Sequence, residues 1–193
     1  MNALTSLSDE ELLARYASGE AAAFGVLFDR HHGPIYRLAR AMLRDAQLAE
    51  DALQETFLAV ARAASRFEPR ARFATWISRI ARNRCLDLVG ARQRRERPAE
   101  QPTLRLLGTV PAVGPTPHER LEGDERLRCV RERIETLPDR QREAIALLSL
   151  VGLRYREIAA VMALPSGTVK TLIHRARATL ARALEEDPRC DVR

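Results

Sequence analysis

Hydrophobic residues recur every three or four positions through most of the chain, and no segment shows the alternation of a half-buried strand. A capping-box sequence at residues 8–11 predicts a first helix over residues 8–19. A second helix is expected over residues 20–30, ended by the segment His31-His32-Gly33-Pro34, and a third over residues 35–44. The pattern therefore predicts an all-α protein.

Residues 46–65 predict a fourth helix that carries two different stripes. The core-facing stripe consists of Leu53, Thr56, Phe57, Val60, Ala61 and Ala64. The other stripe consists of Glu50, Asp51, Gln54, Glu55 and Leu58. A solvated acidic face is the ordinary interpretation of such a stripe. Leu58 favours a protein partner instead, because burying a leucine side chain fully gains about 1.5–3 kcal/mol.

The next segment reverses the charge. Residues 66–97 contain ten arginines against three acidic residues, which suits a phosphate backbone. Pro69 fits in the interior of neither neighbouring helix, so it predicts a loop before a long helix over residues 73–95. Trp76 lies at the border of the buried side of that helix. It is interpreted either as a core residue or, together with Phe67, as a platform for unstacked single-stranded bases.

Five of the chain's ten prolines fall within residues 96–120, and a segment of that composition cannot form a long helix. The chain is therefore expected to form two small helical domains, residues 8–97 and 121–186, joined by a flexible proline-rich linker at 98–120. Residues 187–193 are expected to form a short tail.

The second domain has the pattern of a helix-turn-helix. A helix opened by Pro138 is expected to run to about residue 150, and a shorter one covers residues 155–162. Ser166 is the expected N-cap of the last helix. The residues that this helix is expected to bury are Val169, Ile173, Ala176 and Leu180. An ordinary helical hairpin has the same apolar pattern, but the basic outer face favours a helix that enters a major groove.

Composition adds few constraints. The net charge of +6 and the pI near 10.0 favour an anionic partner. Cys85, Cys129 and Cys190 lie far apart without metal-ligand spacing, so reduced thiols are expected, with redox sensing as the alternative. No run has the length of a membrane span and residues 1–8 lack a signal pattern, so a cytoplasmic protein is expected. The sequence shows no glycine-rich phosphate loop and no nucleophile–base pair, so neither an enzyme nor a cofactor is expected.

Four stretches, in this order, resemble the extracytoplasmic-function (ECF) sigma factors of bacterial RNA polymerase. They are AEDALQETFL at residues 49–58, FATWISRIARN at 73–83, LPDRQRE at 137–143 and GTVKTLIHRAR at 167–177. The resemblance covers about residues 12–184 in family order. It implies that the first domain is sigma region 2, which binds core polymerase and recognises and melts the −10 element. It implies that the second domain is sigma region 4, which recognises the −35 element.

The resemblance also implies partners and site residues. The β′ clamp helices of core RNA polymerase would be bound by Glu50, Asp51, Gln54, Glu55 and Leu58. The −10 promoter DNA would be bound by Arg66, Phe67, Arg70, Trp76, Arg79, Asn83 and Arg84, of which the first three belong to the loop of residues 65–72. The −35 DNA, close to the β-flap, would be bound by Ser166, Thr168, Lys170, Thr171, His174, Arg175 and Arg177. An anti-sigma factor is expected to hold the protein inactive.

Two positions depart from the family pattern. The family often has arginine where this chain has Leu172, which could contact a thymine methyl group or join the core. Val89-Gly90-Ala91 replaces a more basic stretch, so the −10 contacts are expected to be weaker or shifted towards Arg92, Arg94 and Arg95. The alternative function is a plain helix-turn-helix repressor with an N-terminal oligomerisation domain. It leaves the acidic helix and its basic neighbour unexplained.

Overall fold

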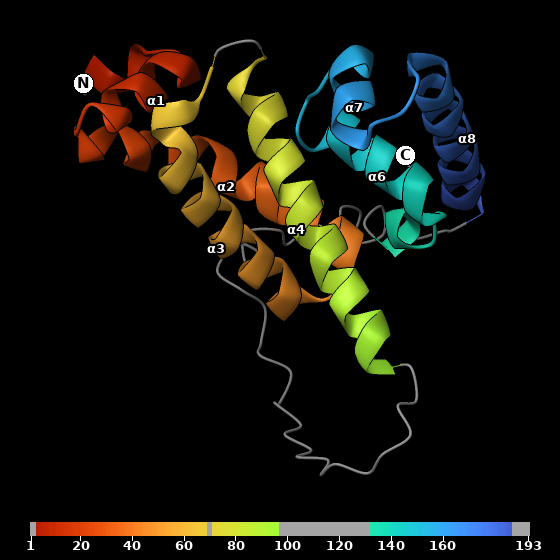
Figure 1. Ribbon diagram of the computed structural model, residues 1–193. Coiled ribbons are helices and arrows are strands. Elements are labelled where there is room, and N and C mark those ends of the chain that lie inside the picture. Colours follow the sequence, from red (N-terminus) through yellow and green to blue (C-terminus); the bar gives the residue numbers. More distant parts are fainter. Residues whose placement is uncertain (1–2, 69–70, 97–131, 187–193) are drawn as a thin grey trace, which may run out of the picture.

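Helices account for the regular structure in the part of the chain that the structure, a computed structural model, describes: residues 3–68, 71–96 and 132–186. In chain order they are the 3₁₀ helix η1 (Ala3–Ser6), α1 (Asp9–Ala17), α2 (Ala21–Leu43), α3 (Ala46–Ala63), the 3₁₀ helix η2 (Ala64–Arg66), α4 (Phe73–Glu96), α6 (Asp139–Ser149), α7 (Tyr155–Met162) and α8 (Ser166–Glu185). The predicted all-α fold is confirmed (Figure 1). The linker predicted at 98–120 and the tail predicted at 187–193 lie outside the described residues.

The predicted helix break at residues 31–34 is wrong, because α2 continues through it with Pro34 inside. A proline in a helix interior removes one N–H donor and costs about 3 kcal/mol. The helix residues on both sides are fully buried in the same core, with Leu27 before the proline and Ile35 and Leu38 after it. Each of these side chains gains about 1.5–3 kcal/mol on burial, and together they outweigh the cost of the proline.

The two predicted helix caps have different outcomes. At the start of α1 the hydroxyl of Ser8 accepts a hydrogen bond from the N–H of Glu11 at 3.2 Å, and the Glu11 carboxylate accepts one from the N–H of Ser8 at 2.8 Å. This capping box is confirmed. The predicted cap of α8 is wrong, because Ser166 is the first residue of that helix and Pro165 is its N-cap. Pro165 has a φ of −60°, which leads the chain into the helix without a side-chain cap.

Each of the two helical units contributes to one contiguous apolar core. In the first unit, α1 to α4, the fully buried side chains include Leu12, Leu13, Leu27, Ile35, Leu38, Phe73 and Ile77. In the second unit, residues 132–186 with α6 to α8, they include Leu147, Ile158, Val169 and Ile173. None of the described helices has both the length and the apolar character that crossing a membrane requires.

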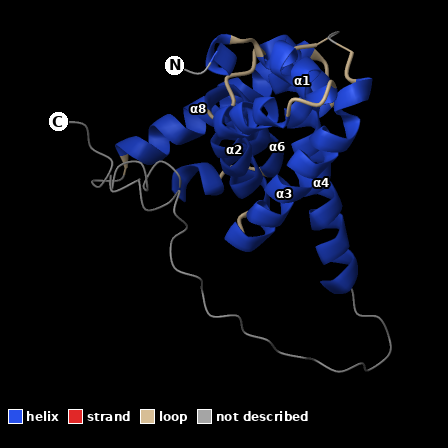
Figure 2. Ribbon diagram, turned by 90° about the vertical axis from the view of Figure 1, so that its left-hand side faces the viewer, coloured by secondary structure: helices blue, strands red, loops and turns tan. Residues whose placement is uncertain are grey.

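The two units pack against each other, α6 against α2 (Figures 1 and 2) and α7 against α4 (Figure 1). The guanidinium of Arg142 on α6 is central to this contact, with only 3% of the residue exposed. Its Nε donates to the carbonyl oxygen of Ala41 on α2 at 2.6 Å. Its other nitrogens bond within their own unit, to the carbonyl oxygen of Leu137 at 2.7 Å and to the carboxylate of Asp139 at 2.6 Å. These acceptors avoid the penalty of a buried charge without partners.

Ion pairs join the same two units. Arg82 on α4 pairs with Glu143 on α6, and their side chains are only 18% and 9% exposed. Two longer pairs connect Arg40 with Glu135 at 3.5 Å and Arg72 with Glu157 at 3.5 Å. The sequence pattern predicts two units but not this contact between them.

We expect reversal of either charge in the Arg82–Glu143 pair to separate the units. Arg82→Glu or Glu143→Arg places two like charges in a mostly buried contact, and losing a buried pair costs about 3 kcal/mol or more. Small-angle X-ray scattering should show a larger radius of gyration for each single variant, and denaturant unfolding should show lower stability. The double variant should recover both properties.

Arg140→Glu, which reverses an exposed charge on the same helix α6, is the control and should change neither property. If both single variants keep the radius of gyration and stability of the unmodified chain, the pair does not hold the units together.

Candidate functional site

The acidic stripe of α3 reaches the surface as predicted. Gln54, Glu55 and Leu58 are exposed, whereas Glu50 and Asp51 are half-buried. Leu58 leaves 53% of its surface in contact with solvent, which is a large fraction for an apolar residue. The stripe therefore places one apolar side chain in line with carboxylates and an amide, a composition suited to a basic protein surface with an apolar pocket.

Three aromatic residues lie together where the chain enters α4. Phe73 is fully buried, whereas Phe67 and Trp76 are half-buried. The ring centroids are 4.8 Å apart for Phe67 and Trp76, and 5.9 Å apart for Phe73 and Trp76. Trp76 thus packs against the core with part of its ring and keeps the rest accessible. This geometry is compatible with both interpretations of Trp76, as a core residue and as a stacking platform.

The predicted polar −10 residues differ in their exposure to solvent and in their ionic contacts. The exposed ones are Arg66, Arg79 and Asn83. Arg84 is half-buried, and its guanidinium lies 3.6 Å from Asp87 and 3.9 Å from Glu55 of α3. The long contact with Glu55 connects the basic segment with the acidic stripe. Arg70 lies outside the described residues. Arg82, three residues after Arg79, does not join the exposed set because it is paired with Glu143.

The last two helices form the predicted helix-turn-helix. At the turn, Ala163 adopts a left-handed conformation with a φ of 53°, and the N–H of Leu164 donates to the carbonyl oxygen of Ala159 at 3.0 Å. The last helix buries Val169, Ile173 and Ala176, and Leu180 is half-buried. The apolar side of α8 thus packs inward, and its other side is free to contact another molecule.

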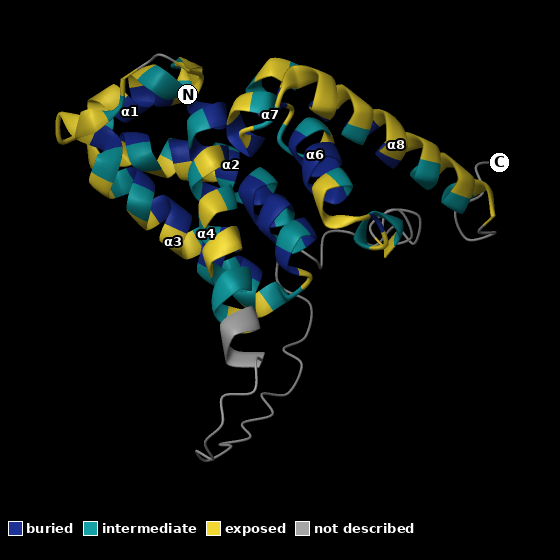
Figure 3. Ribbon diagram, turned by 45° about the vertical axis from the view of Figure 1, so that its right-hand side comes forward, coloured by how far each residue is buried: buried dark blue, intermediate teal, exposed yellow. Residues whose placement is uncertain are grey.

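All seven predicted −35 residues of α8 are exposed: Ser166, Thr168, Lys170, Thr171, His174, Arg175 and Arg177. Much of α8 is accordingly coloured as exposed in Figure 3. The hydroxyl of Thr171 donates to the carbonyl oxygen of Gly167 at 3.1 Å, so its oxygen can still accept a hydrogen bond. Leu172 is half-buried and packs against the core. Of the two roles considered for Leu172, packing is the one that its surroundings favour.

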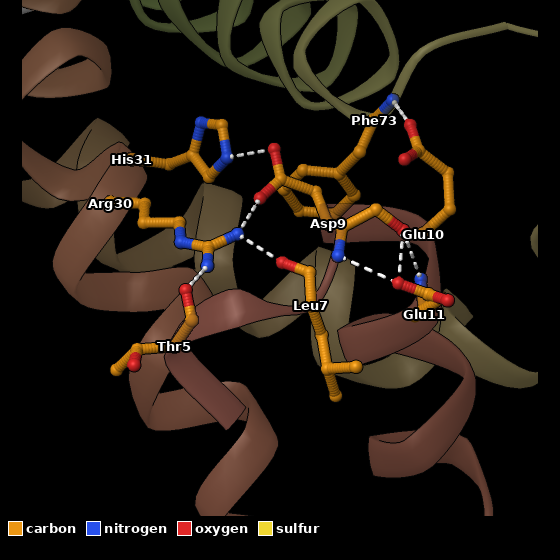
Figure 4. A network of polar contacts seen from close by, with 9 residues as sticks. Thr5, Leu7, Asp9, Glu10, Glu11, Arg30, His31 and Phe73 are labelled. Atoms are coloured by element: carbon orange, nitrogen blue, oxygen red, sulfur yellow. Dashed lines mark hydrogen bonds and ion pairs between the residues drawn. The ribbon is translucent and has the colours of Figure 1, made fainter. Parts of the chain in front are cut away.

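The N-terminal segment is fastened to α2 by a charged network that the sequence analysis missed (Figure 4). The carboxylate of Asp9 lies 2.8 Å from Arg30 and 2.8 Å from the Nε2 atom of His31. Arg30 also donates to the carbonyl oxygens of Thr5 at 2.7 Å and Leu7 at 2.9 Å. The hydrogen bond with His31 lowers the pKa of the Asp9 carboxyl from its ordinary value; burial opposes this effect and Arg30 adds to it.

Cys85 is the one cysteine among the described residues, and it is fully buried beside Tyr36 and Ala39. Burial raises the pKa of its thiol to about 12, and the negative charge of Glu143 adds to the effect. Within the described ranges, no three His, Cys, Asp or Glu side chains are grouped so that they could hold a metal ion.

Comparison with known families gives two matches. The model of sigma-70 region 2 matches residues 27–95, and a model of sigma-70 region 4 matches residues 127–180. The first match contains α3, the aromatic residues and α4. The second contains the helix-turn-helix. The segment before residue 27, with η1 and α1, lies outside both matches.

Curated relatives match over nearly the whole chain. The ECF RNA polymerase sigma factor SigM of Mycobacterium tuberculosis is 36% identical over 92% of this chain and 85% of its own length. The RNA polymerase sigma factor CnrH of Cupriavidus metallidurans is 33% identical over 93% of this chain and 96% of its own length. A solved structure of CnrH in complex with the cytosolic domain of CnrY aligns with a TM-score of 0.66, at 32% identity, and covers 93% of this chain and 98% of that one.

A further solved structure supports the fold. The sigma factor RpoE of Bartonella quintana, solved in complex with the anti-sigma factor NepR, aligns with a TM-score of 0.64. It covers 85% of this chain and 98% of that chain, and the sequence identity is 22%.

The lowered pKa of Asp9 predicts a component of acid-induced unfolding. A carboxyl whose pKa is lower in the folded state stabilises the fold fully above its unfolded pKa, near 3.8, and loses that contribution as the pH falls through the folded value. Denaturant unfolding of the unmodified chain should therefore show a steeper loss of stability below about pH 5 than Asp9→Asn does. Equal slopes for the two proteins would show that Asp9 is not linked to folding.

The raised pKa of Cys85 predicts an unreactive thiol. With Cys129 and Cys190 replaced by serine, the folded chain should react with a thiol reagent at pH 8 at least about a hundredfold more slowly than the chain unfolded in guanidinium. The reason is that a pKa of about 12 instead of 9.0 leaves very little thiolate. A comparable rate in the folded chain would instead support the redox-sensing alternative for this cysteine.

Proposed function

The chain belongs to the extracytoplasmic-function (ECF) family of RNA polymerase sigma factors, and we propose that it binds core RNA polymerase, directs it to promoters with −10 and −35 elements and promotes DNA melting. The observation that carries this proposal is the order of surfaces along one chain. A stripe of exposed and half-buried acidic and amide residues with the exposed Leu58 is followed by two half-buried aromatic rings at the start of a basic helix, and then by a helix-turn-helix with a polar and basic outer side. A repressor needs only the last of these surfaces.

We propose that the acidic stripe of α3 binds the β′ clamp helices of core polymerase through Glu50, Asp51, Gln54, Glu55 and Leu58. Opposite charges would steer the encounter, and burial of Leu58 would supply affinity. The position of the exposed Leu58 within a row of acidic and amide side chains supports this role, since a single exposed leucine elsewhere would be ordinary.

The proposed −10 site lies on the loop before α4 and on α4 itself. Phe67 and Trp76 would stack on bases released from the duplex, since each base–aromatic contact is worth about 1–3 kcal/mol. The polar residues of this site are Arg66, Arg70, Arg79, Asn83 and Arg84, which would hold the phosphate backbone or base edges. Melting then follows from binding energy, because the rings accept bases only after they leave the stack.

We propose that α8 enters the major groove of the −35 element through its exposed residues and that the second unit also lies near the β-flap. A packed Leu172 cannot make the bidentate base contact of an arginine, so base discrimination at this position falls to its exposed neighbours. Lys170, His174 and Arg175 offer donors there.

Further parts of the proposal concern the chain as a whole. Residues 8–97 would act as region 2, residues 121–186 as region 4 and residues 98–120 as the linker. The protein would act by binding alone, without a catalytic site, in the cytoplasm where core polymerase works. An inhibitor protein would cover the DNA-binding surfaces, a proposal supported by the relative CnrH, which was solved with the cytosolic domain of CnrY.

We expect a reversal of charge on α3 to weaken binding to core polymerase. Asp51→Arg with Gln54→Arg places two cations on the proposed contact, and like charges across an interface should weaken core affinity at least about tenfold. Fluorescence anisotropy of the labelled full chain titrated with core polymerase measures this. The matched control is Ala22→Arg with Asp29→Arg, which makes the same net change at exposed positions of α2.

Tight binding by the unmodified chain and by the control, but not by the α3 variant, supports the sigma function. If the unmodified and α3-reversed chains bind core equally poorly while both bind duplex DNA, the repressor alternative is the better account.

A further inference from the structure

The segment before residue 27 lies outside the family matches. One of its side chains nevertheless forms a hydrogen bond with the first residue of α4. The Oε1 atom of Glu10 accepts a hydrogen bond at 2.8 Å from the N–H of Phe73, which is 63 residues later in the chain (Figure 4). Phe73 is the first residue of α4, where N–H groups have no acceptor within the helix. The carboxylate of Glu10 therefore caps α4 from a separate helix, with its negative charge at the positive end of the helix dipole.

The neighbouring Asp9 acts on the ring of the same phenylalanine. Asp9 holds the imidazole of His31 at 2.8 Å, and that imidazole packs edge-on against the ring of Phe73, with centroids 5.0 Å apart. Two consecutive acidic residues of α1 thus fix Phe73 in two ways. Glu10 holds its backbone directly, and Asp9 holds its ring through His31.

Phe73 in turn supports the two aromatic residues of the proposed −10 site. Its ring is fully buried and lies 5.9 Å from Trp76 and 6.4 Å from Phe67. The helix α1 also packs against η2, which directly precedes Phe67. Any shift of the first turn of α4 would therefore move the rings of Phe67 and Trp76 relative to each other.

We propose that Glu10 is a positioning residue for −10 recognition, because its cap on α4 fixes Phe67 and Trp76 in the arrangement that receives unstacked bases. This proposal rests on the proposed function, since it requires that these rings meet DNA. It assigns a role in promoter recognition to a segment that neither family match includes. A positioning role predicts a selective effect: weaker binding of single-stranded −10 DNA, with core binding and duplex binding preserved.

Three substitutions separate positioning from general stabilisation. Glu10→Ala removes the acceptor for the N–H of Phe73, whereas Glu10→Gln keeps an oxygen at the same place without the charge. Glu11→Ala is the matched control, because it removes the same charge one residue later from a carboxylate that bonds Ser8 and belongs to the capping box of α1. If Glu10→Ala does not fold, Glu10→Asp takes its place, since its shorter side chain withdraws the oxygen from Phe73.

The main experiment uses holoenzyme assembled from core polymerase and each full-length variant. The probe is fork DNA with a single-stranded arm of random sequence, enriched beforehand on holoenzyme containing the unmodified chain. Glu10→Ala should bind this fork DNA about three- to tenfold more weakly, as loss of a helix cap would give, and Glu10→Gln should recover most of the affinity. Affinity for core polymerase and for the fully duplex form of the enriched DNA should stay within about twofold for all variants.

A second readout needs no DNA. Trp76 is the only tryptophan of the chain, so its fluorescence reports directly on the aromatic residues in the free protein. Its emission maximum should shift in Glu10→Ala and stay unchanged in Glu11→Ala.

Two outcomes would overturn the proposal. One is fork-DNA binding by Glu10→Ala that equals that of the unmodified chain. The other is an equal loss of core, duplex and fork binding with a lower melting temperature, which would mean that Glu10 only stabilises the fold. If holoenzyme with the unmodified chain enriches no fork DNA at all, the proposed sigma function itself fails, and this failure is distinct because it does not depend on Glu10.

Discussion

The arrangement of the two helical units depends on the buried guanidinium of Arg142. A charge with 3% exposure is stable only where acceptors surround it, and one of these acceptors, the carbonyl oxygen of Ala41, belongs to the other unit. The adjacent Glu143 forms an ion pair with Arg82 of α4. Two consecutive residues of α6, Arg142 and Glu143, thus contact α2 and α4 respectively. These two contacts fix the relative orientation of the units and therefore which of their faces are exposed to solvent. The acidic stripe of α3 and the outer side of α8 are among the faces left exposed.

Local sequence signals predicted most of the helices, because each signal and its structural effect lie within one turn. The capping box at Ser8, the core stripe of α3 and the exposure of Leu58 all follow from spacing of three or four residues. The errors arose where tertiary packing outweighs a local preference. Pro34 signals a break, but the apolar residues on both sides of it share one core, so the helix continues. Ser166 is a good capping residue, yet the fixed φ of Pro165 already starts the helix.

The contacts that sequence reasoning missed join residues far apart in the chain. Arg82 and Glu143 are 61 positions apart, and Glu10 and Phe73 are 63 apart. Glu10 was interpreted only as part of a local capping sequence, and no periodicity distinguishes it from any other exposed acid. Arg142 is one of four charged residues in the motif LPDRQRE, and charged residues are expected at the surface. Without the position of α2, nothing in the sequence specifies which carbonyl group Arg142 meets.

The helix α4 shows why such long-range contacts are needed. One side of it meets the core of its own unit, a second side meets α7, and a third side carries exposed Arg79 and Asn83. Phe73 and Ile77 near its start are large and fully buried, whereas farther along the helix the buried residues are small: Ser78, Ala81 and Cys85. Small side chains bury little apolar surface, so a helix packed in this way gains less from hydrophobic burial than one lined with leucine. The remaining stability and the exact placement must come from polar contacts at its ends and edges, and Glu10 at its first residue and Glu143 at Arg82 provide them. The helix that bears the proposed −10 surface is therefore held by polar groups of other elements as well as by its own core residues, which ties its position to both α1 and the second unit.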